Sequence, residues 1–306
     1  MKKILKGLTF LIGFILIFKF LTLLLVRKGN GYGTDVFDFY KQDKNSIDLL
    51  VLGSSHAYAA FNPYLIEEQT GYKSYVFATQ QQPIWITYYY LKEALKYQNP
   101  KFVVLEVHMI VIDDYEYASE QVNRDAIDKM KFSKNKIDVI NASIENSKDK
   151  LSYYFNIIKY HPRYKELNGI DLKTALLNYT IDNKGYIGLP NENFIFNSED
   201  KYDNEVIEIS KKNEFYYDKI VNLCKEKNIN IILVKTPTSY NNEEVGKLNY
   251  ISKLCYNKNI LFINYIRDID QLNLNYNEDF YDIGHLNKNG SKKMTNNFIK
   301  KLEGLA

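Results

Sequence analysis

The feature that most constrains the fold is an apolar run, residues 47–52, that stops abruptly at the small residues Gly53, Ser54 and Ser55. Five of its six residues are large aliphatics. A run without polar alternation is typical of a strand buried on both faces of a parallel sheet. In open α/β sheets ligands bind beyond the carboxyl ends of the strands, so a serine at this point is a candidate for chemistry. The run alone leaves a second interpretation open, in which Ser54 or Ser55 only caps the following helix.

Strand-like and helix-like segments alternate through most of the remaining chain. After the first strand, the pattern predicts strands at residues 74–78, 101–107, 229–235 and 260–265. It predicts helices at residues 62–69, 84–97, 205–227, 243–257 and 289–302. The repeated strand–helix–strand order implies parallel strands with helices packed on both faces of the sheet.

The alternation weakens between about residues 113 and 204. Charged and Tyr-rich helical pieces alternate there with turns such as those at residues 168–169 and 188–190. A segment of this length is too long for a simple connection between two strands of one sheet. We therefore expect an insertion that forms either a cap over the active face or an interaction surface.

The N-terminus carries a separate signal. Residues 8–26 are nearly all Leu, Ile, Phe and Val, and at 1.5 Å per residue they reach about 28 Å, close to the hydrocarbon thickness of a bilayer. Because no small-residue cleavage site follows, we predict an uncleaved anchor, with a cleaved signal peptide as the alternative. Basic residues lie on both sides of the span with a small excess before it, which favours a cytoplasmic N-terminus and an extracytoplasmic domain. Lys19 interrupts the span and is expected to snorkel toward its outer edge.

These signals divide the chain into three parts. We expect residues 1–28 to form a cytoplasmic N-terminus with a transmembrane anchor, residues 29–46 a linker and lead-in, and residues 47–306 the α/β domain that carries the insertion. The linker is short and rich in glycine at residues 29–34. Such a tether keeps the domain close to the membrane, which favours substrates or partners located there.

Composition excludes several other classes of protein. Lys and Arg number 40 against 37 Asp and Glu, a formal net charge of +3, and no basic run is interleaved with aromatics, which argues against nucleic-acid binding. The two cysteines, Cys224 and Cys255, are expected to be buried free thiols, with a disulfide in an oxidising compartment as the alternative. None of the four histidines stands in a metal-ligand spacing such as HExxH, so we expect neither a metal nor a cofactor.

The most specific stretch lies between the fifth predicted strand and the last predicted helix. Here Asp282 and His285 stand three residues apart on one loop. Nucleophilic serine catalysis needs a base to take the hydroxyl proton and a carboxylate to orient that base. A five-stranded parallel sheet returns this loop to the strand ends where the Gly-Ser-Ser turn lies. We therefore predict that the three groups act together, and the alternative is a turn-capping Asp282 beside a surface histidine.

A family resemblance rests on these two stretches. The sequences LVLGSSH at residues 50–56 and DIGHLN at residues 282–287 resemble the first and last motif blocks of the SGNH (GDSL-like) hydrolase superfamily. Within it, the chain resembles membrane-anchored members of the DltD, AlgX and AlgJ kind, which work beside membrane-bound O-acyltransferases. The resemblance covers residues 47–302 apart from the insertion, and it implies a flavodoxin-like three-layer α/β/α domain with a five-stranded parallel sheet.

The resemblance also assigns roles to individual residues. It implies Ser55 as the nucleophile, His285 as the general base and Asp282 as the partner that orients this base. Ser54 occupies the aspartate position of a GDS block and is a candidate for substrate or oxyanion binding. The choice of Ser55 over Ser54 rests on the alignment of these blocks.

The expected oxyanion hole departs from the pattern of the superfamily. There, the amide of the nucleophile, a glycine amide after the second strand and an asparagine side chain after the third strand stabilise the oxyanion. Here Thr79 and Gln80 stand near the glycine position, where a backbone amide can still donate, and His108 or a glutamine side chain would replace the asparagine. Glu106 is expected to be a buried strand-end carboxylate paired with a loop amide. His56 is expected to pack on the first helix.

The resemblance implies acyl transfer through an ester on Ser55. The expected reaction moves an acetyl or D-alanyl group from a membrane-bound O-acyltransferase partner to a hydroxyl of an envelope polysaccharide or teichoic-acid-like polymer. One alternative is an envelope carbohydrate esterase, because the same triad can use water as the acceptor. A second alternative is a non-catalytic envelope assembly or binding protein that keeps the fold.

Overall fold

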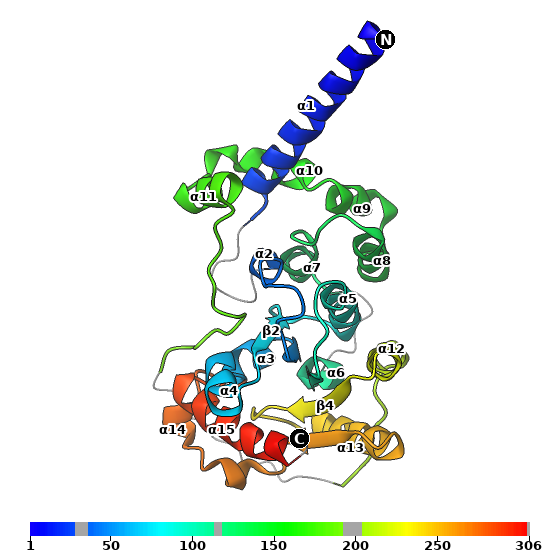
Figure 1. Ribbon diagram of the computed structural model, residues 1–306. Coiled ribbons are helices and arrows are strands. Elements are labelled where there is room, and N and C mark those ends of the chain that lie inside the picture. Colours follow the sequence, from blue (N-terminus) through cyan, green and yellow to red (C-terminus); the bar gives the residue numbers. More distant parts are fainter. Residues whose placement is uncertain (28–35, 113–117, 192–203, 305–306) are drawn as a thin grey trace.

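The computed structural model describes residues 1–27, 36–112, 118–191 and 204–304 (Figure 1). The predicted glycine-rich linker at residues 29–34 lies outside this part of the chain. At the centre lies a sheet of five parallel strands in the order β2-β1-β3-β4-β5. The strands are β1 Leu49–Gly53, β2 Ser74–Ala78, β3 Phe102–Glu106, β4 Asn230–Lys235 and β5 Leu261–Asn264. This is the flavodoxin-like strand order, so the predicted fold class is confirmed.

The strand order creates a switch point beside β1. The chain moves from β1 to one side to form β2, and then crosses to the other side of β1 to form β3. In open α/β sheets the crevice at such a reversal, beyond the carboxyl ends of the strands, is where ligands bind. Ser55 follows β1 directly and therefore lies at this crevice.

Helices cover the sheet; the five predicted helices are all present, one of them with a corrected start, and short helices that were not predicted lie between them. The helices of the α/β domain are α2 Val36–Phe39, α3 Ser55–Ala60, α4 Pro63–Thr70, α5 Ile84–Ala94, α6 His108–Ile112, α12 Lys211–Glu226, α13 Asn242–Asn257, α14 Tyr276–Asp279 and α15 Lys288–Glu303, with a 3₁₀ helix, η2, at Ile269–Leu272. The predicted start of α12 at residue 205 was wrong. Ile207 instead donates its amide hydrogen to the carbonyl oxygen of Gly246 at 3.0 Å, which ties this stretch to α13. The helix begins only after Ser210, whose Oγ accepts the amide hydrogen of Asn213 at 3.2 Å.

Strand β1 explains why the apolar run has no polar alternation. Leu50 and Leu52 pack into one core together with side chains of α5 and α12. Leu49 and Val51 pack into a second core together with side chains of α3, α4 and α15. Every residue of β1 is buried. The two cores lie on opposite faces of the sheet, because side chains alternate along a strand, and they make the three layers of the domain.

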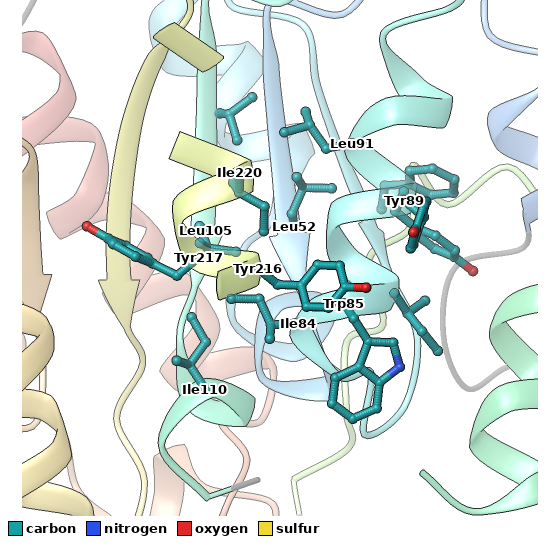
Figure 2. Close-up of a cluster of buried hydrophobic side chains, with 14 of the residues drawn as sticks. Leu52, Ile84, Trp85, Tyr89, Leu91, Leu105, Ile110, Tyr216, Tyr217 and Ile220 are labelled. Atoms are coloured by element: carbon teal, nitrogen blue, oxygen red, sulfur yellow. The ribbon is translucent and has the colours of Figure 1, made fainter. Parts of the chain in front are cut away.

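Figure 2 shows the first of these cores, between the sheet and the pair α5 and α12. Leu52 and Leu105, on neighbouring strands, lie beside Ile220 of α12, and Trp85 of α5 belongs to the same core. Burial of each aliphatic side chain of this size contributes about 1.5–3 kcal/mol. The indole N–H of Trp85 donates to the hydroxyl of Ser143 at 3.2 Å, so this core also holds the first part of the insertion.

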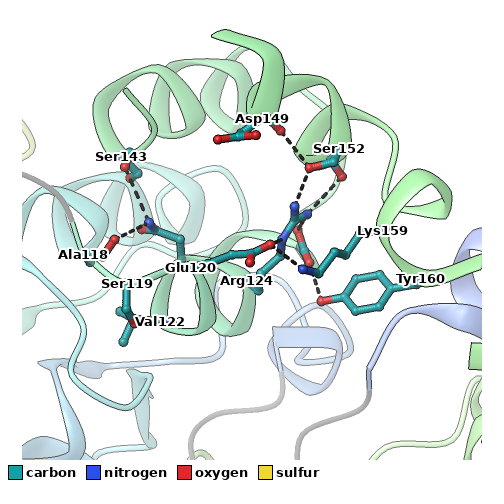
Figure 3. A network of polar contacts seen from close by, with 12 residues as sticks. Ala118, Ser119, Glu120, Val122, Arg124, Ser143, Asp149, Ser152, Lys159 and Tyr160 are labelled. Carbon is teal, nitrogen blue, oxygen red and sulfur yellow. Dashed lines mark hydrogen bonds and ion pairs between the residues drawn. The ribbon is translucent and has the colours of Figure 1, made fainter. Parts of the chain in front are cut away.

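The insertion is helical and joins α6 to α12. Its helices are α7 Glu120–Ile127, α8 Lys134–Ser143, α9 Ser147–Tyr154, α10 Ile157–Tyr160 and α11 Gly169–Leu177, with a 3₁₀ helix, η1, at His161–Lys165. Helix α8 packs against α5, where the side-chain amide of Asn135 donates to the carbonyl oxygen of Tyr89 and to the carboxylate of Glu93, both at 2.9 Å. Figure 3 shows Arg124 of α7 joined to Ser152 of α9, where its Nη1 donates to the Ser152 carbonyl oxygen at 3.0 Å. The insertion is thus cross-linked within itself and fastened to the α/β domain.

The N-terminal helix α1, Lys2–Leu25, projects from the insertion side of the molecule (Figure 1). Among the described residues it is the one helix long and apolar enough to cross a membrane, a property that a signal sequence shares. Its last turn is not free, because Leu25 and Val26 form a small core with Tyr160. The insertion therefore lies between α1 and the α/β domain.

Candidate active site

The turn that carries Ser55 depends on a glycine. Gly53 ends β1 with a φ of +151°, a conformation that favours glycine, and a Cβ at this position would lie 2.8 Å from the Cβ of Glu106 on β3. The close approach lets β1 pass straight into α3, whose first residue is Ser55. The Ser55 amide lies in the first turn of α3, where helix geometry supplies no intrahelical carbonyl partner. Ser55 itself is only 6% exposed, so its hydroxyl is largely shielded from bulk water.

The second part of the site is the loop between α14 and α15. A bridge between Phe280 and Leu286 closes this loop, and Tyr281 donates its amide hydrogen to the carbonyl oxygen of His285 at 2.8 Å. Asn287 then caps α15, because its Oδ1 accepts the amide hydrogen of Asn289 at 2.9 Å. The Phe280–Leu286 bridge and the capped start of α15 together restrain the conformation of the loop.

Three side chains from these two segments form a hydrogen-bonded chain. The Oγ of Ser55 lies 2.8 Å from Nε2 of His285. Nδ1 of the same ring lies 2.8 Å from Oδ1 and 3.0 Å from Oδ2 of Asp282. Because an ionised carboxylate can only accept, the proton of a neutral His285 belongs on Nδ1, which leaves Nε2 free to accept the proton of Ser55. This is the arrangement required of a nucleophile, a general base and an orienting acid.

Asp282 is kept ionised by its surroundings. Burial by itself raises the pKa of this carboxyl, but the hydrogen bonds and charge of His285, together with the backbone amides of Gly284 and His285, outweigh it and hold the pKa below its usual range. Both amides donate to Oδ1 at 2.8 Å. Since the carboxylate accepts three N–H groups, it is fixed in direction as well as in charge.

Two further histidines stack behind the general base. The ring of His56 on α3 lies 4.6 Å from the ring of His285 and 3.6 Å from the ring of His108, between centroids. Burial, helped by neighbouring positive charge, lowers the pKa of both His56 and His108 well below the usual value. Both rings are therefore neutral at physiological pH. His56 was expected to pack on the first helix; the structure places it within α3, with its ring against those of His108 and His285.

A buried lysine sets the tautomer of His108. The Nζ of Lys235, the last residue of β4, lies 2.9 Å from Nδ1 of His108. An ammonium group only donates, so Nδ1 accepts and the ring proton of His108 sits on Nε2. Burial lowers the pKa of Lys235 to about 8 and raises the pKa of nearby Glu106, while the attraction between the two charges opposes both effects. His108 can thus present a neutral N–H donor at the end of β3.

Glu106 behaves as a buried strand-end carboxylate. Its Oε1 accepts the amide hydrogen of His108 at 3.0 Å and the hydroxyl of Thr236 at 3.2 Å. It is 2% exposed and lies behind the turn at Gly53 rather than on the open side of the crevice. These contacts agree with the expected pairing of Glu106 with a loop amide.

The remaining predicted residues lie at the same edge of the sheet but differ in what they can do. Thr79 follows β2, and its amide hydrogen donates to Oε1 of Gln82 at 3.0 Å, so this amide is already engaged. Gln80 is the next residue and is exposed. Ser54 precedes α3 and is fully buried, and its hydroxyl has no hydrogen-bond partner among the residues described. Of the expected oxyanion candidates, His108 thus has the clearest donor.

Sequence reasoning did not single out two residues that shape the site, Lys235 and Gln82. Lys235 is a charged residue at the carboxyl end of a buried strand, which is a recognisable signal for a group aimed at the crevice. Gln82 is fully buried and spans Thr79 and Thr87 through its side-chain amide, a loop contact that no sequence pattern reveals. Within residues 1–27, 36–112, 118–191 and 204–304, no group of His, Cys, Asp and Glu side chains is arranged to hold a metal ion.

Comparisons with known proteins give distant structural likenesses. No protein-family model matches the sequence, and no curated protein matches it significantly. An acetyl xylan esterase of known structure has a TM-score of 0.42 and 15% sequence identity, over 83% of this chain and 99% of that protein. A protein of Bacteroides fragilis described as an acylhydrolase has a TM-score of 0.40 and 13% identity, over 86% of this chain and 90% of that protein. Similarities this distant assign no activity to this chain. The activity is therefore inferred from the arrangement of the side chains.

Proposed function

We propose that the chain is a serine-dependent acyl-transfer enzyme in which Ser55 is the nucleophile, His285 the general base and Asp282 the residue that orients it. The single observation that carries the proposal is the continuous chain of hydrogen bonds from Ser55 Oγ through His285 to Asp282, with a shortest link of 2.8 Å at each end of the ring. A surface histidine beside a turn-capping aspartate would have no reason to meet a buried serine that is 230 residues away in the sequence.

The chemistry follows from these contacts. Nε2 of His285 takes the hydroxyl proton as Ser55 Oγ attacks the acyl carbonyl carbon, and the resulting tetrahedral oxyanion is stabilised by N–H donors. Candidate donors are the amide of Ser55 and the Nε2–H of His108. The protonated His285 then gives its proton to the leaving alcohol, which departs and leaves the acyl group on Ser55. In the second half, His285 deprotonates the acceptor hydroxyl, which attacks the ester and frees the serine.

We also propose a donor and an acceptor for the acyl group. We propose that α1 is retained as a membrane anchor with the domain outside the cell, and that the acyl group, acetyl or D-alanyl, reaches Ser55 from a membrane-bound O-acyltransferase and passes to an envelope glycopolymer. The family resemblance supports this reading, as does an apolar N-terminal helix with no acidic residue. Hydrolysis is the second candidate, because Asp282 is 41% exposed and water therefore reaches the triad from that side.

The nucleophile can be tested by covalent labelling. A serine-directed fluorophosphonate should label the full-length chain in detergent, and Ser55→Ala should abolish the label. The matched control is Ser54→Ala, which removes a neighbouring hydroxyl that makes no hydrogen bond with the described residues. We expect this variant to label at the wild-type rate. Labelling that survives Ser55→Ala, or that disappears in Ser54→Ala alone, would refute the assignment.

Transfer and hydrolysis are separated by the fate of the acyl group. Purified chain would be loaded with an activated acetyl ester, and the acetyl-Ser55 species detected by intact mass. Addition of an oligosaccharide acceptor should shorten the lifetime of the acyl-enzyme and yield acetylated sugar if the enzyme is a transferase. Loss of the acetyl group as acetate at a rate independent of the sugar would identify an esterase. A folded chain that never acquires the acetyl group would favour the binding protein.

A further inference from the structure

The insertion exposes an unusual set of large apolar side chains near α1. We call this set the apolar collar, and its members share two properties: each is exposed, and each lies on α9, α10, η1 or α11 or directly beside one of them. They are Leu151, Phe155, Ile158, Tyr164, Ile170, Leu172, Leu176 and Leu177. Soluble surfaces seldom gather so many apolar side chains around one feature, and such patches mark contact with another phase or molecule.

Helix α11 shows the pattern most clearly, because its polarity is inverted. Its buried side chains are Asp171 and Thr174, whereas Leu176 and Leu177 are 66% and 75% exposed. A helix at a water-facing surface normally has its apolar stripe on the inside. The inversion is expected only where the outer face of α11 meets an apolar environment.

The buried polar side of α11 has a specific task. Nη2 of Arg163 donates to the carboxylate of Asp171 at 3.2 Å, and Nη1 of the same guanidinium donates to the carbonyl oxygen of Leu25, the last residue of α1. Asp171 also accepts the amide hydrogen of Asn168 at 3.1 Å in a capping box. Arg163 thus fixes α11 to the end of α1. If α1 is inserted in a membrane, its depth there also determines the depth of α11.

The length of α1 indicates that the apolar environment next to α11 is the hydrocarbon core of a membrane. The apolar residues 8–26 reach about 28 Å, just enough for a hydrocarbon core of about 30 Å. Within this span, residues 8–17 are exposed apart from the half-buried Gly13, and they reach about 15 Å, although Phe14 and Ile15 among them line a hollow shared with the insertion. Beyond them, the ring of Phe18 meets the ring of Phe155 at 6.2 Å between centroids, and residues 21–26 are half-buried or buried. If α1 spans the bilayer, the collar that surrounds its outer half lies within the hydrocarbon as well.

A hollow beside α1 points to the same environment. It measures about 420 Å³ and lies between α1 and the insertion. Phe14 and Phe18 line it from α1, and Phe132 and Phe155 line it from the insertion. Four lysines and Asp128 also line it. The aromatic part of the hollow, which follows α1, suits an acyl chain of a lipid.

We propose that the apolar collar is immersed in the outer leaflet of the membrane, where it seats the catalytic domain against the bilayer. The proposal rests on the retention of α1 as an anchor. The exposed tyrosine of the collar, Tyr164, and its neighbours Lys165 and Lys173 have the amphipathic character of residues at a membrane–water interface. Since α8 is fastened to α5, immersion of the collar fixes the height and tilt of Ser55 above the membrane. A substrate or acyl donor at the membrane surface would then be met in one orientation.

The test measures the depth of single labelled positions in the full-length chain, reconstituted in nanodiscs of phosphatidylcholine and phosphatidylglycerol. Leu177→Cys would carry an environment-sensitive fluorophore, with doxyl-labelled lipid as the quencher from within the bilayer and iodide as the quencher from water. The native cysteines are buried, and the chain without the added cysteine gives the blank. The matched control is Tyr256→Cys on α13, a large exposed residue, 86% exposed, at the opposite end of the molecule from α1 (Figure 1).

The expected result is that the label at Leu177 is quenched by the lipid and protected from iodide, while the label at Tyr256 behaves in the opposite way. Equal access of iodide to both labels would overturn the proposal. Protection from iodide without quenching by lipid would overturn it too, because a second copy of the chain would then cover the collar.

Two further measurements separate other causes of failure. A label at Phe14→Cys on α1 reports whether the anchor itself is in the bilayer, so an unquenched label there refutes the anchor rather than the collar. In native membranes, a photocrosslinking amino acid at Leu177 should give lipid adducts. A discrete protein adduct would show that a membrane protein occupies the collar, and that result would also overturn the proposal.

Discussion

The substitution Asp282→Asn tests the proposed catalytic chain without disturbing the fold. In the wild-type loop, Oδ1 accepts the amide hydrogens of Gly284 and His285, both at 2.8 Å. An asparagine can keep these two bonds only through its carbonyl oxygen, and its NH₂ group then takes the place of Oδ2, 3.0 Å from Nδ1 of His285. The retained Oδ1 lies 2.8 Å from Nδ1 but already accepts two backbone amides, and the new NH₂ group is a donor that competes with the Nδ1 proton. With the negative charge also gone, the variant favours the tautomer that carries the ring proton on Nε2.

The consequence is a base in the wrong tautomer. Nε2, which lies 2.8 Å from Ser55 Oγ, would then donate to the hydroxyl instead of accepting its proton. The loss of a correctly oriented base in this way lowers the rate by about 10⁴, which corresponds to about 5.4 kcal/mol in the activation barrier. The fold should hardly change, because the Asp282 side chain is 41% exposed, and surface changes of this kind cost about 0.5 kcal/mol.

The assay is the second-order rate of fluorophosphonate labelling, together with the thermal unfolding midpoint of the same samples. Asp268→Asn serves as the control, because Asp268 is a partly exposed carboxylate whose ion-pair partner is Lys301, at 3.9 Å, rather than a residue of the triad. It should label at the wild-type rate. If Asp282→Asn labels within about tenfold of the wild type while it remains folded, Asp282 does not orient His285 and the assignment of the triad is wrong.

Three further predictions concern the fold and its buried charges. Gly290→Ala should lower the free energy of unfolding by at least about 2 kcal/mol, because its Cβ would lie 2.2 Å from the backbone oxygen of Asp279; an unchanged midpoint in urea unfolding would contradict this. Lys235→Met should lower the free energy of unfolding by about 3–5 kcal/mol, because it leaves the buried Glu106 without its cation. The double variant with Glu106→Gln should recover most of this loss in the same urea assay. A double variant no more stable than Lys235→Met would argue against the pairing. Burial lowers the pKa of Lys136 to about 8, so between about pH 8 and 10.5 the unfolded chain holds more protons than the folded one. Lys136 by itself therefore makes the free energy of unfolding rise with pH over this range, against the opposing effect of buried groups such as Cys224 whose pKa is raised. The slope of stability against pH should be lower in Lys136→Met than in the wild type; an identical slope in the two proteins would exclude the contribution of Lys136.

The sequence predicted the architecture well because the sheet is buried on both faces. Continuous aliphatic runs such as residues 47–52 and 229–235 arise where both sides of a strand meet helices, and β1 and β4 lie within or very near those bounds. Helix ends marked by local capping were also predictable, as at α4, where Pro63 opens the helix and Gly71 ends it with a φ of +73°. The start of α12 was missed because it depends on a contact between Ile207 and Gly246 on α13, which is a tertiary interaction.

For the candidate site, the sequence by itself determined which groups could react: a serine in a small-residue turn after a buried strand, and an aspartate and a histidine three apart on a late loop. Only the tertiary structure decided that Ser55 and His285 meet at 2.8 Å, because closing a loop of 230 residues depends on the order of the strands and on no local pattern. The tertiary structure also decided that Lys235 sets the tautomer of His108, and that Oε1 of Gln82 accepts the amide hydrogen of Thr79. Local propensities fix elements and turns, whereas the meeting of distant polar groups in a buried crevice follows from how those elements pack.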